Sequence, residues 1–153
     1  MNWLNPEKTL SEQGIEETVV LTLRKKFFFT DPNVNGNDPV QLNLIYAQSR
    51  DAIINGTHPC TLAEAVKLAA FQCQILYGNY NEAKHKPGFL PLKEFLPRKH
   101  VNMKKIEISI FAEHCKLHDY AEIDAKFHYI QLCQSLKTYG VTFYLVEVRT
   151  CML

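Results

Sequence analysis

The residues that could do chemistry in this chain are mainly cations, and they are gathered in one stretch. Between positions 84 and 105 the sequence reads KHKPGFLPLKEFLPRKHVNMKK, which holds seven basic residues and a single acid, Glu94. The 153-residue chain has a net charge of only +1, so positive charge is concentrated in this stretch, called the basic segment below. Such a segment is typical of a surface that docks on an anionic partner, or of a solvated connector whose charges maintain solubility.

The basic segment also carries side chains that can hold it in place. Three prolines interrupt it, and proline lacks the backbone donor that a helix interior needs. Its large apolar residues can anchor it to a core: Phe89, Leu90, Leu92, Phe95 and Leu96. The sequence therefore predicts a kinked, anchored cationic surface with one short helix over residues 92–96.

A second group of chemistry-bearing residues is the pentapeptide 114–118, HCKLH. It places His114 and His118 four residues apart with Cys115 between them, a spacing that binds a metal when a third ligand and a general base are near. The glutamate of an H-E-x-x-H site is absent. Polar residues at the end of a helix are therefore the favoured interpretation, and no metal is predicted.

No motif in the sequence marks an enzyme or a cofactor site. The patterns G-x-S-x-G, G-x-x-x-x-G-K and G-x-G-x-x-G do not occur. The odd number of scattered cysteines, without a C-x-x-C pair, indicates reduced thiols rather than disulfides. Cys73 and Cys133 fall on apolar faces, where core packing is expected. We predict a non-catalytic protein without a cofactor.

The near-neutral total charge narrows the class of anionic partner. Nucleic-acid-binding proteins usually combine an overall positive balance with a recognisable motif, and this chain has neither. A membrane surface fits better, because about four to eight Lys or Arg near one surface attract anionic lipid at roughly 1 kcal/mol each, an attraction that salt weakens. No apolar run reaches the roughly 18 residues that span a bilayer, and the first residues lack the core of a signal peptide.

The elements that would position the basic segment are mainly helices. Asp38 and Pro39 are typical of a helix start, and the apolar stripe that follows stops at Gly56. Thr61 and Glu64 form a capping-box pattern for a second helix that runs to Gly78.

Two further helices are expected after the basic segment. The first runs from Asn102 to Lys116, although alternating isoleucines between positions 106 and 110 leave a strand as the competing interpretation. A second capping-box pattern, from Asp119 to Glu122, predicts a last helix that ends near Gly140.

Residues 18–23 and 141–148 have strand patterns but no partner nearby. The chain thus reads as a helical lobe with one unpaired strand on each side, as in a piece of a larger multi-lobe protein.

Several stretches carry a family resemblance along nearly the whole chain. They are NWLNPEKTLSEQGI, LRKKFFFTDPNVNGNDPVQLNLIYAQSRDAIINGTHP, FQCQILYG, HKPGFLPLKEFLP and EIDAKFHYIQLCQSLKTYGV. These stretches resemble the heads of talins, which belong to the FERM superfamily. The resemblance implies a mainly α fold: a FERM central lobe, a four- to five-helix bundle of the acyl-CoA-binding-protein-like type, flanked by single strands from neighbouring lobes.

The resemblance also implies domain boundaries. Residues 1–29 correspond to the C-terminal end of the ubiquitin-like lobe and residues 30–37 to a linker. Residues 38–140 correspond to the helical central lobe, and residues 141–153 to the first strand of the third lobe.

The resemblance implies a cytoskeletal adaptor at the cytoplasmic face of the plasma membrane. Its expected partners are anionic, phosphoinositide-rich lipids and the neighbouring FERM lobes of the same protein. Integrin tails and actin are expected to bind through parts outside this chain, and nucleic acid is not expected. The alternative is a purely structural spacer lobe with protein–protein contacts and no lipid binding.

The family's membrane patch carries over to this chain residue by residue. Lys86 matches one of its lysines, whereas the next basic position falls at Asn102, with Lys104 as a substitute. Glu147 and the polar residues His128, Gln131 and Gln134 stand where talin heads are usually basic, so the patch is thinner here. The expected lipid-binding residues are Lys86, Arg98, Lys99, Lys104 and Lys105.

Overall fold

The computed structural model describes residues 3–22, 24 and 38–141, and every regular element in these ranges is helical. The α-helices are α1 (Pro39–Ile54), α2 (Leu62–Tyr77), α3 (Ile106–His114) and α4 (Glu122–Ser135). Three short 3₁₀ turns accompany them: η1 (Ser11–Gln13), η2 (Leu92–Glu94) and η3 (Cys115–Leu117). This confirms the predicted mainly α bundle. No helix within the described residues is long and apolar enough to cross a membrane.

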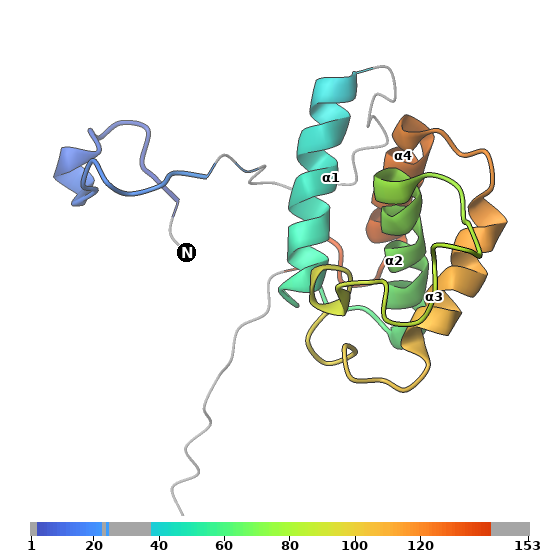
Figure 1. Cartoon of the computed structure of the whole chain (residues 1–153). Helices are drawn as coiled ribbons and strands as arrows, with labels where there is room; N and C mark the ends of the chain where they lie inside the picture. Colours follow the sequence, from blue (N-terminus) through green and yellow to red (C-terminus); the bar gives the residue numbers. More distant parts are fainter. Residues whose placement is uncertain (1–2, 23, 25–37, 142–153) are drawn as a thin grey trace, which may run out of the picture.

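The helices run in two directions, as Figure 1 shows. In Figure 1 α1 and α4 run one way, while α2 and α3 run the other way. Hydrogen bonds agree with this arrangement: Gln74 near the end of α2 donates to the carbonyl of Tyr120, just before α4, at 2.9 Å. His114 at the end of α3 likewise lies against Gly78 at the end of α2. Neighbours α2 and α3 are therefore parallel.

Helix α2 is the centre of the bundle. Eight of its residues are buried, including the small side chains of Ala65, Ala69 and Cys73, which let α3 and α4 approach closely. Helix α1 packs on α4 through an edge-to-face contact between Tyr46 and Tyr129, whose ring centroids lie 5.0 Å apart.

The starts of α1 and α2 are those that the sequence predicted. The carboxylate of Asp38 accepts hydrogen bonds from the N–H groups of Val40 and Gln41, both at 3.0 Å. Thr61 Oγ1 accepts from Glu64 N at 3.3 Å, and Glu64 Oε2 accepts from Thr61 N at 2.7 Å, which completes the capping box.

Helix α3 is shorter than predicted. It begins at Ile106 instead of Asn102, because residues 100–105 form turns and Lys105 has a left-handed backbone with φ of 61°. The competing strand interpretation of this region was wrong. The short helix predicted at residues 92–96 is the 3₁₀ turn η2.

The capping box predicted at Asp119 and Glu122 is also wrong. Asp119 has φ of 66° and donates its N–H to Asn79 Oδ1 at 3.0 Å, so Ala121 becomes the residue before α4. The helix also ends at Ser135, well before Gly140, since Leu136 is extended.

No strand forms over residues 18–22, and Val20 is 90% exposed. A lone strand has no partner to satisfy its backbone groups, which explains the difference from the sequence pattern. Apart from Val141, the second predicted strand lies outside the described residues.

Candidate functional site

The middle of the basic segment is anchored in the core. Leu90, Phe95 and Leu96 are 6%, 2% and 1% exposed. Gln72 of α2 adds a polar attachment, because its side-chain amide donates to the carbonyl of Glu94 at 2.9 Å. The apolar residues of the segment therefore fix its path, and its cations remain exposed beside them.

Glu107, in the first turn of α3, holds the early part of the segment. Its carboxylate accepts hydrogen bonds from Gly88 N at 2.7 Å and from Leu90 N at 2.9 Å. The turn needs glycine, since Gly88 has φ of 92°. Glu107 thus places the loop that carries Lys86 against the start of α3.

Lys104 and Lys105 immediately precede α3, so they lie at the same end of that helix as the Glu107 clamp. The structure brings these two lysines and the Lys86 loop to one region. The amino end of a helix is itself weakly positive, which favours a bound anion there.

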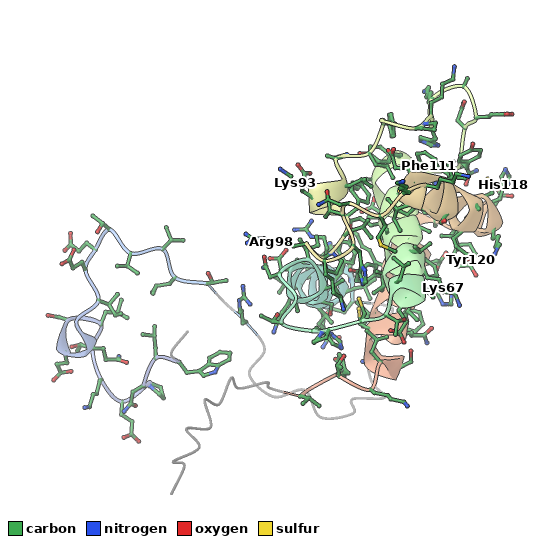
Figure 2. The ribbon with its side chains drawn as sticks, turned by 90° about the horizontal axis from the view of Figure 1, so that it is seen from below. Lys67, Lys93, Arg98, Phe111, His118 and Tyr120 are labelled. Carbon is green, nitrogen blue, oxygen red and sulfur yellow. The ribbon has the colours of Figure 1, made fainter. Side chains whose placement is uncertain are left out.

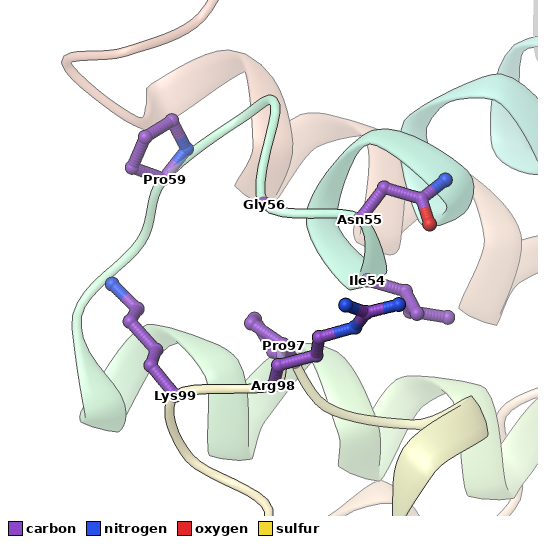
Figure 3. Close-up of a pocket in the computed structure, with 7 residues that line it drawn as sticks. All are labelled: Ile54, Asn55, Gly56, Pro59, Pro97, Arg98 and Lys99. Atoms are coloured by element: carbon purple, nitrogen blue, oxygen red, sulfur yellow. The ribbon is translucent and has the colours of Figure 1, made fainter.

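Arg98 and Lys99 lie at a different place, beside the carboxyl end of α1. They line a cavity of about 280 Å³ together with Pro97 and four residues at the end of α1 and in the loop after it. In Figure 3 the Arg98 guanidinium extends toward Ile54 and Asn55, whereas the Lys99 side chain extends toward Pro59. Lys99 Nζ donates to the carbonyl of Cys60 at 2.7 Å, so this ammonium group braces the loop between α1 and α2.

No carboxylate in the described part of the chain forms an ion pair with a cation of the basic segment. The ion pairs found there join Arg50 to Asp51, Lys116 to Glu113, Lys126 to Glu122 and, when the histidine is protonated, His118 to Asp119. Figure 2 shows Lys93 and Arg98 projecting from one side of the helical lobe, away from Lys67, His118 and Tyr120. The segment is therefore a cationic region whose charge is not neutralised by the described residues.

His114 and His118 have very different surroundings. His114 is fully buried, and its Nε2 lies 2.9 Å from the carbonyl of Gly78 and 3.1 Å from Gln74 Oε1. His118 is exposed and lies 2.8 Å from Asp119. His114 is thus a polar residue at the end of α3, as expected, but it is buried in the core. Within the residues described, no three His, Cys, Asp or Glu side chains gather as a metal site.

The sequence did not identify His85 as a buried residue. It is 5% exposed, and its Nδ1 accepts a hydrogen bond from Asn81 N at 2.9 Å. Its ring stacks on Phe111 at 5.7 Å between centroids and lies 5.3 Å from the ring of His114. Burial lowers the pKa of both histidines, and the charge of Lys84 lowers the pKa of His85 further.

Cys73 and Cys133 pack in the core, as predicted, and both are fully buried. Burial raises the pKa of Cys73 to about 12 and raises that of Cys133 as well. Because the thiolate is the reactive form, these cysteines are inert.

Residues 31–144 match the model of the FERM central domain family. Among curated proteins, the chain is 58% identical to a talin of Oscarella pearsei and 52% identical to talin-1 of Gallus gallus, in each case over 97% of its length. It spans only 6% of the length of either relative. Among solved structures, the FERM domain of Drosophila Merlin in complex with its C-terminal domain aligns with a TM-score of 0.76 at 22% identity. This alignment covers 94% of the present chain and 51% of the Merlin chain, and it shows a shared fold.

Proposed function

The chain belongs to the FERM central domain family and resembles talin heads, and from that membership we propose that its basic segment docks a larger cytoskeletal adaptor on anionic membrane. In this proposal the lobe is a non-catalytic part of the adaptor and acts in cytoskeletal adhesion, as its talin relatives indicate. The preferred lipid surface is rich in phosphoinositides at the cytoplasmic face of the plasma membrane. Links to integrin-type receptors and actin run through parts of the protein outside this chain.

The observation that carries the proposal is the fixed, unpaired positive charge of the basic segment. Lys86, Lys104 and Lys105 extend from a frame held by Glu107 and by the buried apolar anchors. Arg98 adds a further cation without an ion-pair partner among the described residues. The three lysines, which lie in one region, contribute about 1 kcal/mol each, or roughly 3 kcal/mol before screening and about 150-fold in partition. Lys99 lies within the proposed surface and also braces it through Cys60.

We also propose the domain boundaries that the family resemblance implies. Residues 38–140 are the central lobe, joined by residues 30–37 to the end of the first lobe at residues 1–29. Residues 141–153 begin the third lobe.

A spacer lobe without lipid binding is the second candidate, and α1 provides the observation that favours it. Val40 and Leu44, one turn apart on α1, are 67% and 55% exposed. An apolar pair on a helix surface suits contact with a neighbouring lobe of the same protein.

Vesicle co-sedimentation over a salt series from about 0.05 M to about 0.5 M separates the two candidates. Docking predicts strong enrichment on anionic over neutral vesicles at low salt, weakened by salt. The charge reversals Lys86→Glu and Lys104→Glu should abolish it. Lys67→Glu is the matched control, because this exposed lysine of α2 lies outside the basic segment and away from Lys93 and Arg98 (Figure 2). Equal binding to neutral and anionic vesicles at low salt would refute docking and support the spacer.

A further inference from the structure

The loop that carries Lys84 and Lys86 is closed by a histidine. The ring Nδ1 of His85 accepts a hydrogen bond from the backbone N–H of Asn81 at 2.9 Å, and the backbone N–H of His85 donates to the carbonyl of Asn81 at 2.8 Å. Together with hydrogen bonds to Asn81 from Lys84 N at 3.1 Å and Ala83 N at 2.9 Å, they close residues 81–85 into a turn. Because the imidazole lies against Phe111 and His114 of α3, the same side chain also joins the turn to that helix.

The hydrogen bond from Asn81 fixes the protonation state of His85. A backbone N–H can only donate, so Nδ1 must carry a lone pair and the proton of the neutral ring must be on Nε2. A second proton would have to enter at Nδ1, where it would face the N–H of Asn81. The closed turn is therefore incompatible with a charged His85.

The groups around His85 do not compensate a positive charge. Its titratable neighbours come from α2, the following loop and α3: Tyr77, Tyr80, Lys84, His114 and, across a shared cavity, Cys115. Lys84 is a cation and His114 can become one, so both oppose a charged His85. Among the described residues, no carboxylate forms a hydrogen bond or an ion pair with this imidazole.

We propose that His85 is a proton-operated latch: protonation at Nδ1 breaks its bond to Asn81, detaches residues 81–87 from α3, and adds His85 to the cationic surface of Lys84 and Lys86. The open latch presents three consecutive positive charges, whereas the closed latch presents two. An anionic membrane stabilises the open form, so lipid binding and proton uptake at His85 favour each other.

The effect of the latch on lipid binding rests on the membrane docking proposed above. The latch itself can be tested first without lipid. The amide of Asn81 reports the latch directly through its hydrogen-exchange protection, taken as the intrinsic exchange rate divided by the observed rate at each pH. If only the open form takes the proton, with an ordinary pKa near 6.5, opening rises about tenfold between about pH 7.5 and about pH 5.5. Protection of Asn81 should fall by that factor.

The variant His85→Gln keeps a side-chain acceptor that does not titrate. Its Asn81 protection should be independent of pH over this range, whereas His118→Gln, which removes an exposed histidine, should behave as the unmodified chain does. Imidazole nitrogen shifts in NMR should place the proton of His85 on Nε2 at pH 7.5. A proton on Nδ1, or protection of Asn81 that does not change with pH, would overturn the latch.

The second test uses vesicles of phosphatidylcholine containing phosphatidylinositol bisphosphate. Binding by the unmodified chain should strengthen by up to about fivefold over the same pH range, the effect of one added cation near the surface. His85→Gln should lose this gain and retain the binding seen at pH 7.5. If His100→Gln removes the gain and His85→Gln does not, His100 is the sensor and the proposal is wrong. Absence of vesicle binding at every pH would refute the docking function, while the Asn81 measurement would still decide the latch.

Discussion

The substitution Glu107→Gln tests whether one carboxylate holds the basic segment in place. Glu107 is the acceptor for two backbone donors, Gly88 N at 2.7 Å and Leu90 N at 2.9 Å. Glutamine preserves the length of the side chain but offers one oxygen instead of two. Its amide group would face one of the backbone N–H groups, so one of the two hydrogen bonds must be lost.

The expected cost follows from the geometry of this pair. A hydrogen bond to a charged group contributes about 1.5–3 kcal/mol, and partial exposure of Glu107 reduces that figure. We expect a loss of about 1–2 kcal/mol in the free energy of unfolding. With a urea m value of about 2 kcal/mol/M, the middle of the usual range, this corresponds to a midpoint lower by about 0.5–1 M.

Urea unfolding followed by circular dichroism measures the shift. The matched control is Glu113→Gln on the same helix, where the carboxylate pairs only with exposed Lys116. The control should cost less than about 0.5 kcal/mol, because exposed ion pairs contribute little. Equal midpoints for the two variants would refute the clamp.

Three further outcomes are expected. Stability should fall as pH drops below about 6.5, because burial lowers the pKa values of His58, His85 and His114 and the unfolded chain therefore binds protons more readily. Urea midpoints measured across pH check this. A midpoint that rises on acidification would contradict it. Thr61→Ala should cost about 1 kcal/mol by removing half of the capping box, as calorimetry would measure, while an unchanged melting temperature would show that the cap is dispensable. Tyr46→Phe should leave stability unchanged or raise it by up to about 1 kcal/mol, since the buried Tyr46 hydroxyl has no hydrogen-bond partner among the described residues; a large loss in urea unfolding would show that it has one.

Local sequence signals predicted the fold where local contacts decide it. Asp38 and Thr61 cap α1 and α2 with donors two or three residues away, so their patterns are reliable. Asp119 has the same pattern, but its backbone bonds to Asn79, forty residues earlier. That distant contact replaces the local cap, and a linear pattern carries no sign of it. Lys105 is a similar case, because its positive φ delays α3.

The charged residues of the candidate site could be predicted from the sequence, but the contacts that hold them in place could not. The basic residues are evident from composition, and their apolar anchors from the leucines and phenylalanines between them. The clamp by Glu107 joins residues 17–19 positions apart. His85 stands between two lysines, where a solvated side chain is the natural expectation. Its burial depends on Phe111 and His114, which only the folded arrangement brings to it.

Because α2 and α3 are parallel, the basic segment also serves as part of the long connection between them. Two parallel neighbours cannot be joined by a tight turn, because the chain must return along the length of α2, about 24 Å for its sixteen residues. Residues 78–105 make that return outside the bundle, as Figure 1 shows. The cationic surface is thus built on a crossover connection that the parallel arrangement of α2 and α3 requires. Its length is constrained by the direction of the helices, whereas the exposed residues along it are free to vary in charge.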